Sequence, residues 1–102
     1  MSNLVSLTVM VPALNEERNL EAAVLVIIKA LDDSGIDWEI VLVNDGSTDK
    51  TGDIANELAS QEPRIKVIHH QRARGVGYCF REGIKFSTKD AITWVPGDGE
   101  NE

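Results

Sequence analysis

The segment WEIVLVNDGSTDKT, residues 38–51, decides the fold class. It opens with an apolar run, whereas a strand with one face in water would alternate polar and apolar residues. The run therefore predicts a strand over residues 38–43 that is covered on both faces, as strands of parallel sheets are. The tripeptide NDG then breaks the strand, and Ser47 or Thr48 is expected to cap a helix.

The same order of strand and helix is predicted on both sides of this segment. On the N-terminal side, a strand over residues 4–11 stops at Pro12, and Asn15 is expected to cap a helix that ends at Gly35. On the C-terminal side, the pattern predicts a strand over residues 65–68, a helix over 76–87 and a strand over 91–95. Strands that alternate with helices of this length form a parallel sheet with right-handed crossovers. The sequence thus predicts an α/β fold with helices on both faces of the sheet.

Several side chains outside the loops are expected to be structural. The third helix should bury a stripe of Val76, Phe80 and Ile84, together with a small apolar Cys79. Glycines within that helix are expected where it packs closely on the sheet. Trp94 is predicted to belong to the core, and the pair His69-His70 to end its strand in solvent.

Composition and charge limit the classes of partner. The chain has 102 residues, 10 basic and 17 acidic, and a net charge of −7, which fits one domain over residues 1–102. This charge argues against duplex nucleic acid and anionic membranes as partners, but it allows a nucleotide. The one cysteine excludes an internal disulfide and favours a reducing, cytoplasmic location. The N-terminus lacks the basic start of a signal peptide, and no apolar run is long enough to cross a bilayer.

The loops that follow the strands carry the chemistry. In an open parallel sheet, ligands bind beyond the carboxyl ends of the strands. Three of these four loops present acids, namely Glu16, Asp45 and Asp98. Such a concentration of negative charge favours a partner that is cationic or rich in hydrogen-bond donors. A divalent metal together with a nucleotide would meet both needs, although each acid alone could be only a turn or helix-capping residue.

Several common motifs are missing from these loops. The first loop lacks the G-x-G-x-x-G of dinucleotide-binding proteins, and no P-loop or G-x-S-x-G nucleophile elbow occurs. The run that begins at Asp45 fails as a calcium loop, because Lys50 replaces the required glycine and Asn56 the final glutamate.

Four segments, in order, resemble the N-terminal half of a family 2 glycosyltransferase of the GT-A fold. They are VPALNEERNL, IVLVNDGSTDKT, RARGVGYCFREGI and TWVPGDGEN, and they cover nearly the whole chain. The branch they resemble includes the dolichyl-phosphate mannosyltransferases. The resemblance implies the strand order 3-2-1-4 and inverting, metal-assisted transfer from a UDP- or GDP-linked sugar. It also implies that the catalytic base lies beyond residue 102, so this chain is expected to be an inactive, truncated half.

The resemblance implies a role for particular residues. It places Pro12, Leu14 and Glu16 along the nucleotide, and Asp45 against the base with Val43 beside it. Arg74, just ahead of a helix, is expected near the phosphates.

The metal site departs from the family pattern. The family's D-x-D motif binds a divalent cation, but Pro96 stands in place of its first acid and only Asp98 remains. Asp98 and Glu100 are then the expected ligands of Mg²⁺ or Mn²⁺.

Two other functions stay open from the sequence. The chain could be a non-catalytic nucleotide-binding or interaction module that has lost the metal site, as Pro96 suggests. A nucleotidyltransferase-like enzyme is less favoured, because such enzymes use a Gly/Arg/Lys-rich first loop. A polyprenyl phosphate is one acceptor that the resemblance implies, and the parent protein would then act at the cytoplasmic face of a membrane. Self-association is expected if truncation exposes an apolar face.

Overall fold

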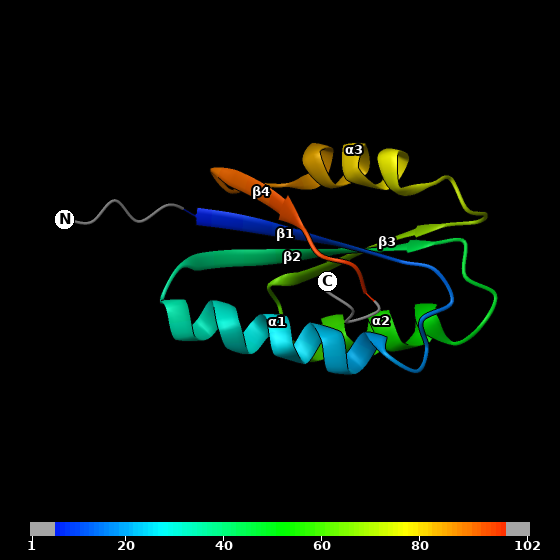
Figure 1. The fold of residues 1–102 in the computed structure, drawn as a ribbon, viewed down its shortest axis with the longest axis horizontal. Helices are drawn as coiled ribbons and strands as arrows, with labels where there is room; N and C mark the ends of the chain where they lie inside the picture. The colour runs from blue at the N-terminus through cyan, green and yellow to red at the C-terminus, as the bar shows by residue number, and fades with distance from the viewer. Residues whose placement is uncertain (1–5, 98–102) are drawn as a thin grey trace.

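The computed structural model describes residues 6–97, and strands alternate with helices throughout this range. The elements are β1 (Ser6–Ala13), α1 (Leu20–Ser34), β2 (Asp37–Asp45), α2 (Thr51–Gln61), β3 (Ile65–His70), α3 (Val76–Phe86) and β4 (Ala91–Trp94). The strands form one parallel sheet in the order β3-β2-β1-β4 (Figure 1). The predicted α/β fold and strand order are confirmed. Within residues 6–97, no helix combines the length and apolarity needed to cross a membrane.

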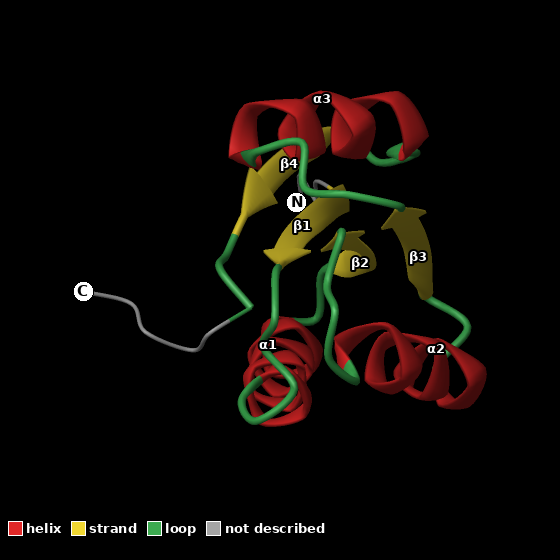
Figure 2. Ribbon diagram, turned by 90° about the vertical axis from the view of Figure 1, so that its right-hand side faces the viewer, coloured by secondary structure: helices red, strands yellow, loops and turns green. Residues whose placement is uncertain are grey.

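The helices cover the two faces of the sheet unequally. Figure 2 shows α1 and α2 below the sheet and α3 alone above it. The larger apolar cluster lies between the sheet and α1 with α2, and includes Ile40 and Leu42 of β2. The smaller cluster lies under α3 and includes Val41 and Val43 of β2. Because side chains of a strand alternate, the odd-numbered residues of β2 face α3.

β1 runs two residues further than predicted, through Pro12 to Ala13. The carbonyl of Pro12 accepts a hydrogen bond from the Gly97 N–H on the β4 side, at 3.2 Å. The N–H that proline lacks would point to the same side, where regular pairing ends at Met10 and Trp94, although the Val95 N–H still donates to the Met10 carbonyl at 3.0 Å. Pro12 therefore ends the ladder on the β4 side, while the pairing of β1 with β2 continues to Ala13.

The first two helices begin later than predicted. The backbone of Asn15 is left-handed, with φ at 54°, and α1 begins only at Leu20. The Asn15 side chain instead accepts the Thr48 N–H at 2.8 Å. α2 begins at Thr51, whose N–H donates to the Asp49 carboxylate at 2.9 Å. The end of α1 at Gly35 is confirmed, since this glycine has a left-handed φ of 73°.

The predicted buried stripe of α3 holds only at the half-buried Phe80, which packs in the cluster under the helix, although the ends of the helix are close to those expected. Val76 and Ile84 are 52% and 47% exposed, and the fully buried positions are Cys79 and Gly83. A Cβ on Gly83 would lie 2.5 Å from Cγ of Met10, so close packing on β1 selects glycine there. The helix thus turns Cys79 and Gly83 toward the sheet, with Phe80 beside them and Val76 and Ile84 largely exposed.

Candidate functional site

A pocket of about 270 Å³ opens at the carboxyl end of the sheet. Four of the residues that the sequence predicted for a nucleotide site line it, namely Pro12, Leu14, Glu16 and Asp45. Its other walls come from the end of β1, from the loop before α3, from α3 itself, and from the end of β4 and the segment after it; these residues are Ala13, Ala73, Gly75, Val76, Cys79, Trp94, Pro96 and Gly97. Residues from three strand ends therefore share one cavity, as expected for a parallel sheet that binds ligands beyond the carboxyl ends of its strands.

The predicted metal ligands Asp98 and Glu100 lie outside the described residues. Gly97, which precedes Asp98, lines the pocket, and its N–H donates to the Pro12 carbonyl at 3.2 Å. The chain therefore leads from the pocket wall directly into the acidic segment that the sequence predicted to hold a cation.

Hydrogen bonds join the β1–α1 loop to the β2–α2 loop. The Glu16 N–H donates to Oγ1 of the buried Thr51 at 2.8 Å. The Lys50 N–H donates to the Glu17 carboxylate at 2.9 Å, so Glu17 serves the start of α2 rather than the start of α1. Among residues 6–97, the Glu16 carboxylate has one hydrogen-bond contact, a long one of 3.5 Å with the Asn19 amide. Its backbone is fixed, while its side chain remains available to a ligand.

Asp45 is the most heavily bonded acid of the pocket. Its Oδ1 accepts from Nδ1 of His70 and from the Arg74 N–H, both at 2.8 Å, and its Oδ2 accepts from the Gly75 N–H at 3.0 Å. Burial would raise the pKa of the Asp45 carboxyl, but His70 and the two backbone donors together lower it below its ordinary value. Asp45 is therefore a fixed carboxylate that also shapes the loop before α3.

Gly46 allows the β2–α2 loop to lie against the loop before α3. Its φ is 76°, and a Cβ there would collide with the backbone of Arg72 and Ala73. A residue with a side chain would be strained in this conformation and would push the two loops apart. The glycine of the NDG tripeptide is thus required by the shape of the pocket as well as by the turn.

Cys79 lies beside Asp45 and His70, and one donor atom of each lies within 4.8 Å of the others. Burial, followed by the negative charge of Asp45, raises the pKa of the Cys79 thiol to about 12. Mg²⁺ and Mn²⁺ prefer oxygen ligands, so a thiol and an imidazole do not suit either ion. This cluster is therefore not the place for the predicted divalent metal.

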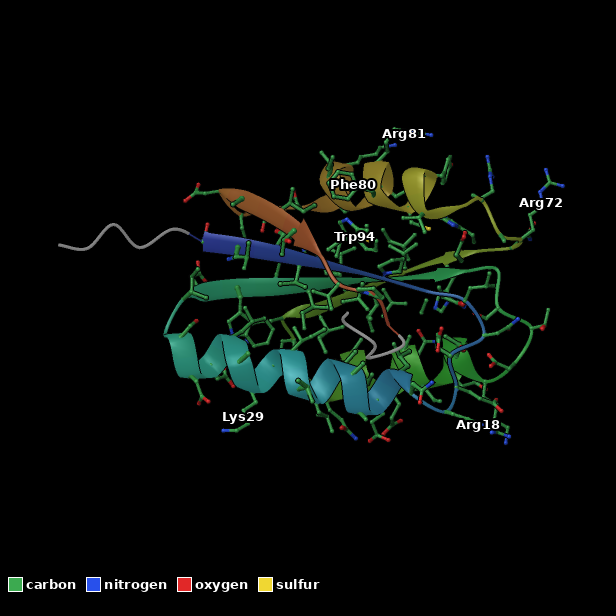
Figure 3. All side chains as sticks on the ribbon, in the orientation of Figure 1. Arg18, Lys29, Arg72, Phe80, Arg81 and Trp94 are labelled. Carbon is green, nitrogen blue, oxygen red and sulfur yellow. The ribbon has the colours of Figure 1, made fainter. Side chains whose placement is uncertain are left out.

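Two predicted site residues lie outside the pocket. The side chain of Val43 is fully buried and packs in the cluster under α3. Arg74 reaches Asp45 through its backbone, while its guanidinium stacks over the ring of Tyr78 at 4.3 Å. The side chain of Arg74 also lines a neighbouring polar hollow, together with Arg72 and both histidines. Figure 3 labels Arg72 at the tip of the loop before α3, beyond the carboxyl end of the sheet.

Sequence reasoning missed three residues of this region. His70 was expected in solvent, but its side chain is 9% exposed and bonded to Asp45. Trp94 was expected in the core, but it is 45% exposed and lines the pocket. Cys79 is buried as expected, but it also forms part of the pocket wall. The alternation of β3 could have found His70, because it places His70 on the face of Ile68 and His69 on the opposite face.

Comparison with known proteins agrees with this geometry. The sequence model of the family described as glycosyl transferase family 2 matches residues 8–102. A dolichyl-phosphate beta-glucosyltransferase of Trichomonas vaginalis is 31% identical over 97 residues, which cover 90% of this chain and 29% of that protein. A dolichol-phosphate mannosyltransferase of Pyrococcus furiosus is 35% identical over 91 residues, which cover 89% of this chain and 25% of that protein. The chain therefore spans between a quarter and a third of the length of these curated relatives.

Solved structures show the same fold. The mannosyltransferase PcManGT of Pyrobaculum calidifontis, solved in complex with GDP-Man and Mn²⁺, superposes with a TM-score of 0.76 at 23% sequence identity. The match covers 90% of this chain and 27% of that one. This similarity identifies the sheet and its helices as the start of a GT-A fold.

Proposed function

The chain belongs to glycosyl transferase family 2, and we propose that it forms the donor-binding part of an enzyme that transfers a hexosyl group from a nucleoside-diphosphate sugar to an acceptor. The observation that carries this proposal is the gathering of Pro12, Leu14, Glu16 and Asp45 around one pocket. Transfer would invert the configuration of the sugar. The catalytic base would lie in the remainder of the parent protein, so the 102-residue chain alone would not turn over a nucleotide sugar.

The chemistry of the pocket residues supports a nucleotide as ligand. Asp45 presents a fixed carboxylate, and the imide or amide N–H groups of uracil and guanine are donors that need such an acceptor. The freer carboxylate of Glu16 would accept from ribose hydroxyls. Pro12 and Leu14 supply apolar wall, and Leu14 is 45% exposed before a ligand covers it.

The diphosphate would lie toward the cationic and metal-binding parts of the site. Arg74 is the proposed phosphate neighbour, since it stands just ahead of α3. Asp98 and Glu100 are the proposed ligands of Mg²⁺ or Mn²⁺, which suits their oxygen donors. When bound, such a cation would offset the charge that develops on the departing diphosphate.

The names of the two relatives support a proposal for the acceptor class. Both are named for dolichyl phosphate, so we propose a polyprenyl phosphate as the acceptor class. The parent protein would then act on the cytoplasmic face of a membrane, while residues 1–102 would form one cytoplasmic unit. Exposed apolar residues on α3 and β4 would favour self-association of the chain when it is alone.

Calorimetric titration with GDP and UDP, with and without Mn²⁺, tests the proposal. The wild-type chain is expected to bind one of the two nucleotides. Asp45→Asn and Glu16→Gln are each expected to weaken binding by about tenfold, because a hydrogen bond to a charged group is lost. Asp53→Asn, an exposed acid of α2, is the matched control and should bind as the wild type does.

The Glu16 variant keeps the test independent of folding, because this carboxylate holds little of the structure. Absence of binding to either nucleotide by a folded wild-type chain would reject the proposal. Binding that Mn²⁺ does not strengthen would favour the alternative, a nucleotide-binding module without a metal site, for which Pro96 is the supporting feature.

A further inference from the structure

His70 lies between two carboxylates that come from different elements. Its Nδ1 is 2.8 Å from Oδ1 of Asp45, at the end of β2, and its Nε2 is 3.8 Å from Oε1 of Glu82, on α3. The His70 side chain is 9% exposed, and its Nε2 is buried without a hydrogen-bond partner. Each nitrogen of this ring thus faces an acid.

The protonation state of His70 decides how these contacts act. A neutral imidazole can donate from Nδ1 to Asp45, but its Nε2 then turns a lone pair toward the Glu82 carboxylate. An imidazolium donates from both nitrogens and attracts both acids. A protonated Nε2 would gain an acceptor after a small movement of Glu82, whereas a neutral Nε2 could gain none from that carboxylate.

Among the other groups around His70, Arg74 is the one that opposes the cation. The rings of His70 and Tyr78 of α3 meet in a T-shaped contact at a centroid distance of 5.1 Å. Cys79 of α3 stays a neutral thiol, because burial raises its pKa to about 12. The charged Arg74 lies on the ring of Tyr78, and its side chain shares a hollow with His70. Of the two carboxylates beside the ring among the described residues, Asp45 is hydrogen-bonded to the His70 ring, and Glu82 lies 3.8 Å from its other nitrogen.

His70 also acts on the geometry of the pocket. Asp45, which His70 holds, accepts from the Arg74 and Gly75 N–H groups and so fixes the loop that leads into α3. Glu82 lies two turns along the same helix. A bridge from Asp45 through His70 to Glu82 therefore ties the pocket acid to α3 at a second point.

We propose that His70, as an imidazolium, is a positioning residue of the nucleotide pocket: it bridges Asp45 to Glu82, and nucleotide affinity falls when it loses its proton. This inference rests on the proposed nucleotide binding at Asp45. It assigns to His70 no contact with substrate.

Affinity for GDP and UDP, measured across about pH 5.5 to 8.5, where an imidazole ordinarily titrates, tests the proposal. The nucleotide phosphate also titrates in this range, so the comparison is between the wild type and His70→Gln. His69→Gln is the matched control, because His69 points to the other face and bonds Asn44 and Asn56. Glu82→Gln tests the second contact without touching Asp45, which keeps the test open if His70→Gln does not fold.

At the acidic end, His70→Gln is expected to bind about tenfold more weakly than the wild type, a loss typical of a hydrogen bond to a charged group. The wild type should lose affinity as pH rises, more steeply than His70→Gln. Glu82→Gln should lose nucleotide affinity at a lower pH than the wild type, because only one carboxylate then stabilises the His70 imidazolium. His69→Gln should match the wild type, and nitrogen NMR should show both nitrogens of His70 protonated at the acidic end.

Equal affinity and equal pH dependence in His70→Gln and His69→Gln would overturn the inference while leaving nucleotide binding intact. If the wild type bound neither nucleotide, the proposed function would fail, and this inference would fail with it. Titration with Zn²⁺ alone gives a further check. Stoichiometric zinc binding that both Cys79→Ser and His70→Gln abolish would show a neutral, ligating imidazole and overturn the proposal.

Discussion

The Asp45 carboxylate is nearly saturated with donors before a ligand arrives. A carboxylate offers about four lone-pair positions. His70 and the Arg74 N–H occupy Oδ1, the Gly75 N–H occupies Oδ2, and the Cys79 thiol lies within 4.8 Å of the same group. A thiol is the weakest donor of the four, and Cys79 lines the pocket. A nucleobase N–H would therefore displace the thiol most easily.

This competition predicts opposite effects of two substitutions at Cys79. Cys79→Ala removes the weak donor and should tighten GDP or UDP binding about threefold, whereas Cys79→Ser supplies a stronger donor and should weaken it by a similar factor. Calorimetry on both variants measures the difference, with thermal unfolding to confirm that each is folded. Equal affinity of the two variants would mean that the nucleotide does not compete for the position of the thiol.

At the residue scale, the sequence predicted that Glu16 and Asp45 lie near one another but not how they are held. Asp45 and Glu16 could be placed together because strand ends of a parallel sheet share one edge. The partners of Asp45 could not be predicted, because they depend on which face each residue of β3 and α3 presents. His70 and Cys79 come to Asp45 only once the pairing of β2 with β3 and the rotation of α3 are known.

At the scale of elements, the rotation of α3 is set by its glycines. Gly83 faces β1, and a Cβ there would lie 2.5 Å from Cγ of Met10 and 3.2 Å from its Cβ. Gly77 of the same helix has only the tip of Arg81 within 4 Å, at 3.9 Å. Replacing either glycine by alanine changes the helix propensity by the same amount. The added methyl group, however, meets Met10 at position 83 and nearly open space at position 77.

Gly83→Ala is expected to destabilise the chain by about 1–3 kcal/mol, because the added methyl overpacks the contact with Met10. Gly77→Ala is expected to stabilise it by about 0.5–1 kcal/mol, the usual gain in helix propensity. Urea unfolding followed by circular dichroism measures both. Stabilisation by both substitutions would show that α3 can move away from β1 at little cost.

The starts of α1 and α2 show why local signals misplace helix ends. Asn15 and Ser47 are good capping residues by type, yet the Asn15 N–H donates to Oγ of Ser47 at 3.0 Å. The polar groups of the two loops hydrogen-bond to one another at the carboxyl edge of the sheet instead of capping the helices, so each helix begins several residues later. No pattern within either loop reveals this exchange, whereas the end of α1 at Gly35 follows from local chemistry and the strand order was implied by the family resemblance.

At the scale of the whole molecule, two buried acids of β2 hold the two ends of α3. Asp45 bonds the loop before the helix, and Glu39 accepts the Thr88 N–H at 2.6 Å and the Thr88 hydroxyl at 2.9 Å after it. Six residues of strand span about 20 Å, and an 11-residue helix is about 16 Å long. The two acids are therefore spaced to match the helix. Because the apolar cluster under α3 is the smaller one, these polar attachments carry much of its docking.

This arrangement predicts that α3 is the first helix to loosen in acid. Burial would raise the pKa of the Glu39 carboxyl, but hydrogen bonds from Thr8 and Thr88 and the contact with Lys66 lower it from 4.5 to about 2. A lowered folded-state pKa stabilises the fold fully above pH 4.5, and that stability is lost as pH falls toward 2. The difference between the two pKa values corresponds to about 3 kcal/mol, and the lowered pKa of Asp45 adds a loss of the same sign.

Glu39→Gln should therefore flatten the dependence of the unfolding free energy on pH between about 4.5 and 2, whereas Glu21→Gln, an exposed acid of α1, should leave it unchanged. Hydrogen exchange as pH is lowered, corrected for intrinsic exchange rates, should show the amides of α3 losing protection before those of α1 in the wild type. Simultaneous loss of protection in both helices would show that the sheet and its two faces unfold as one unit. The two acids of β2 would then stabilise the whole fold rather than the docking of α3, and the pocket wall that α3 provides would be as stable as the core.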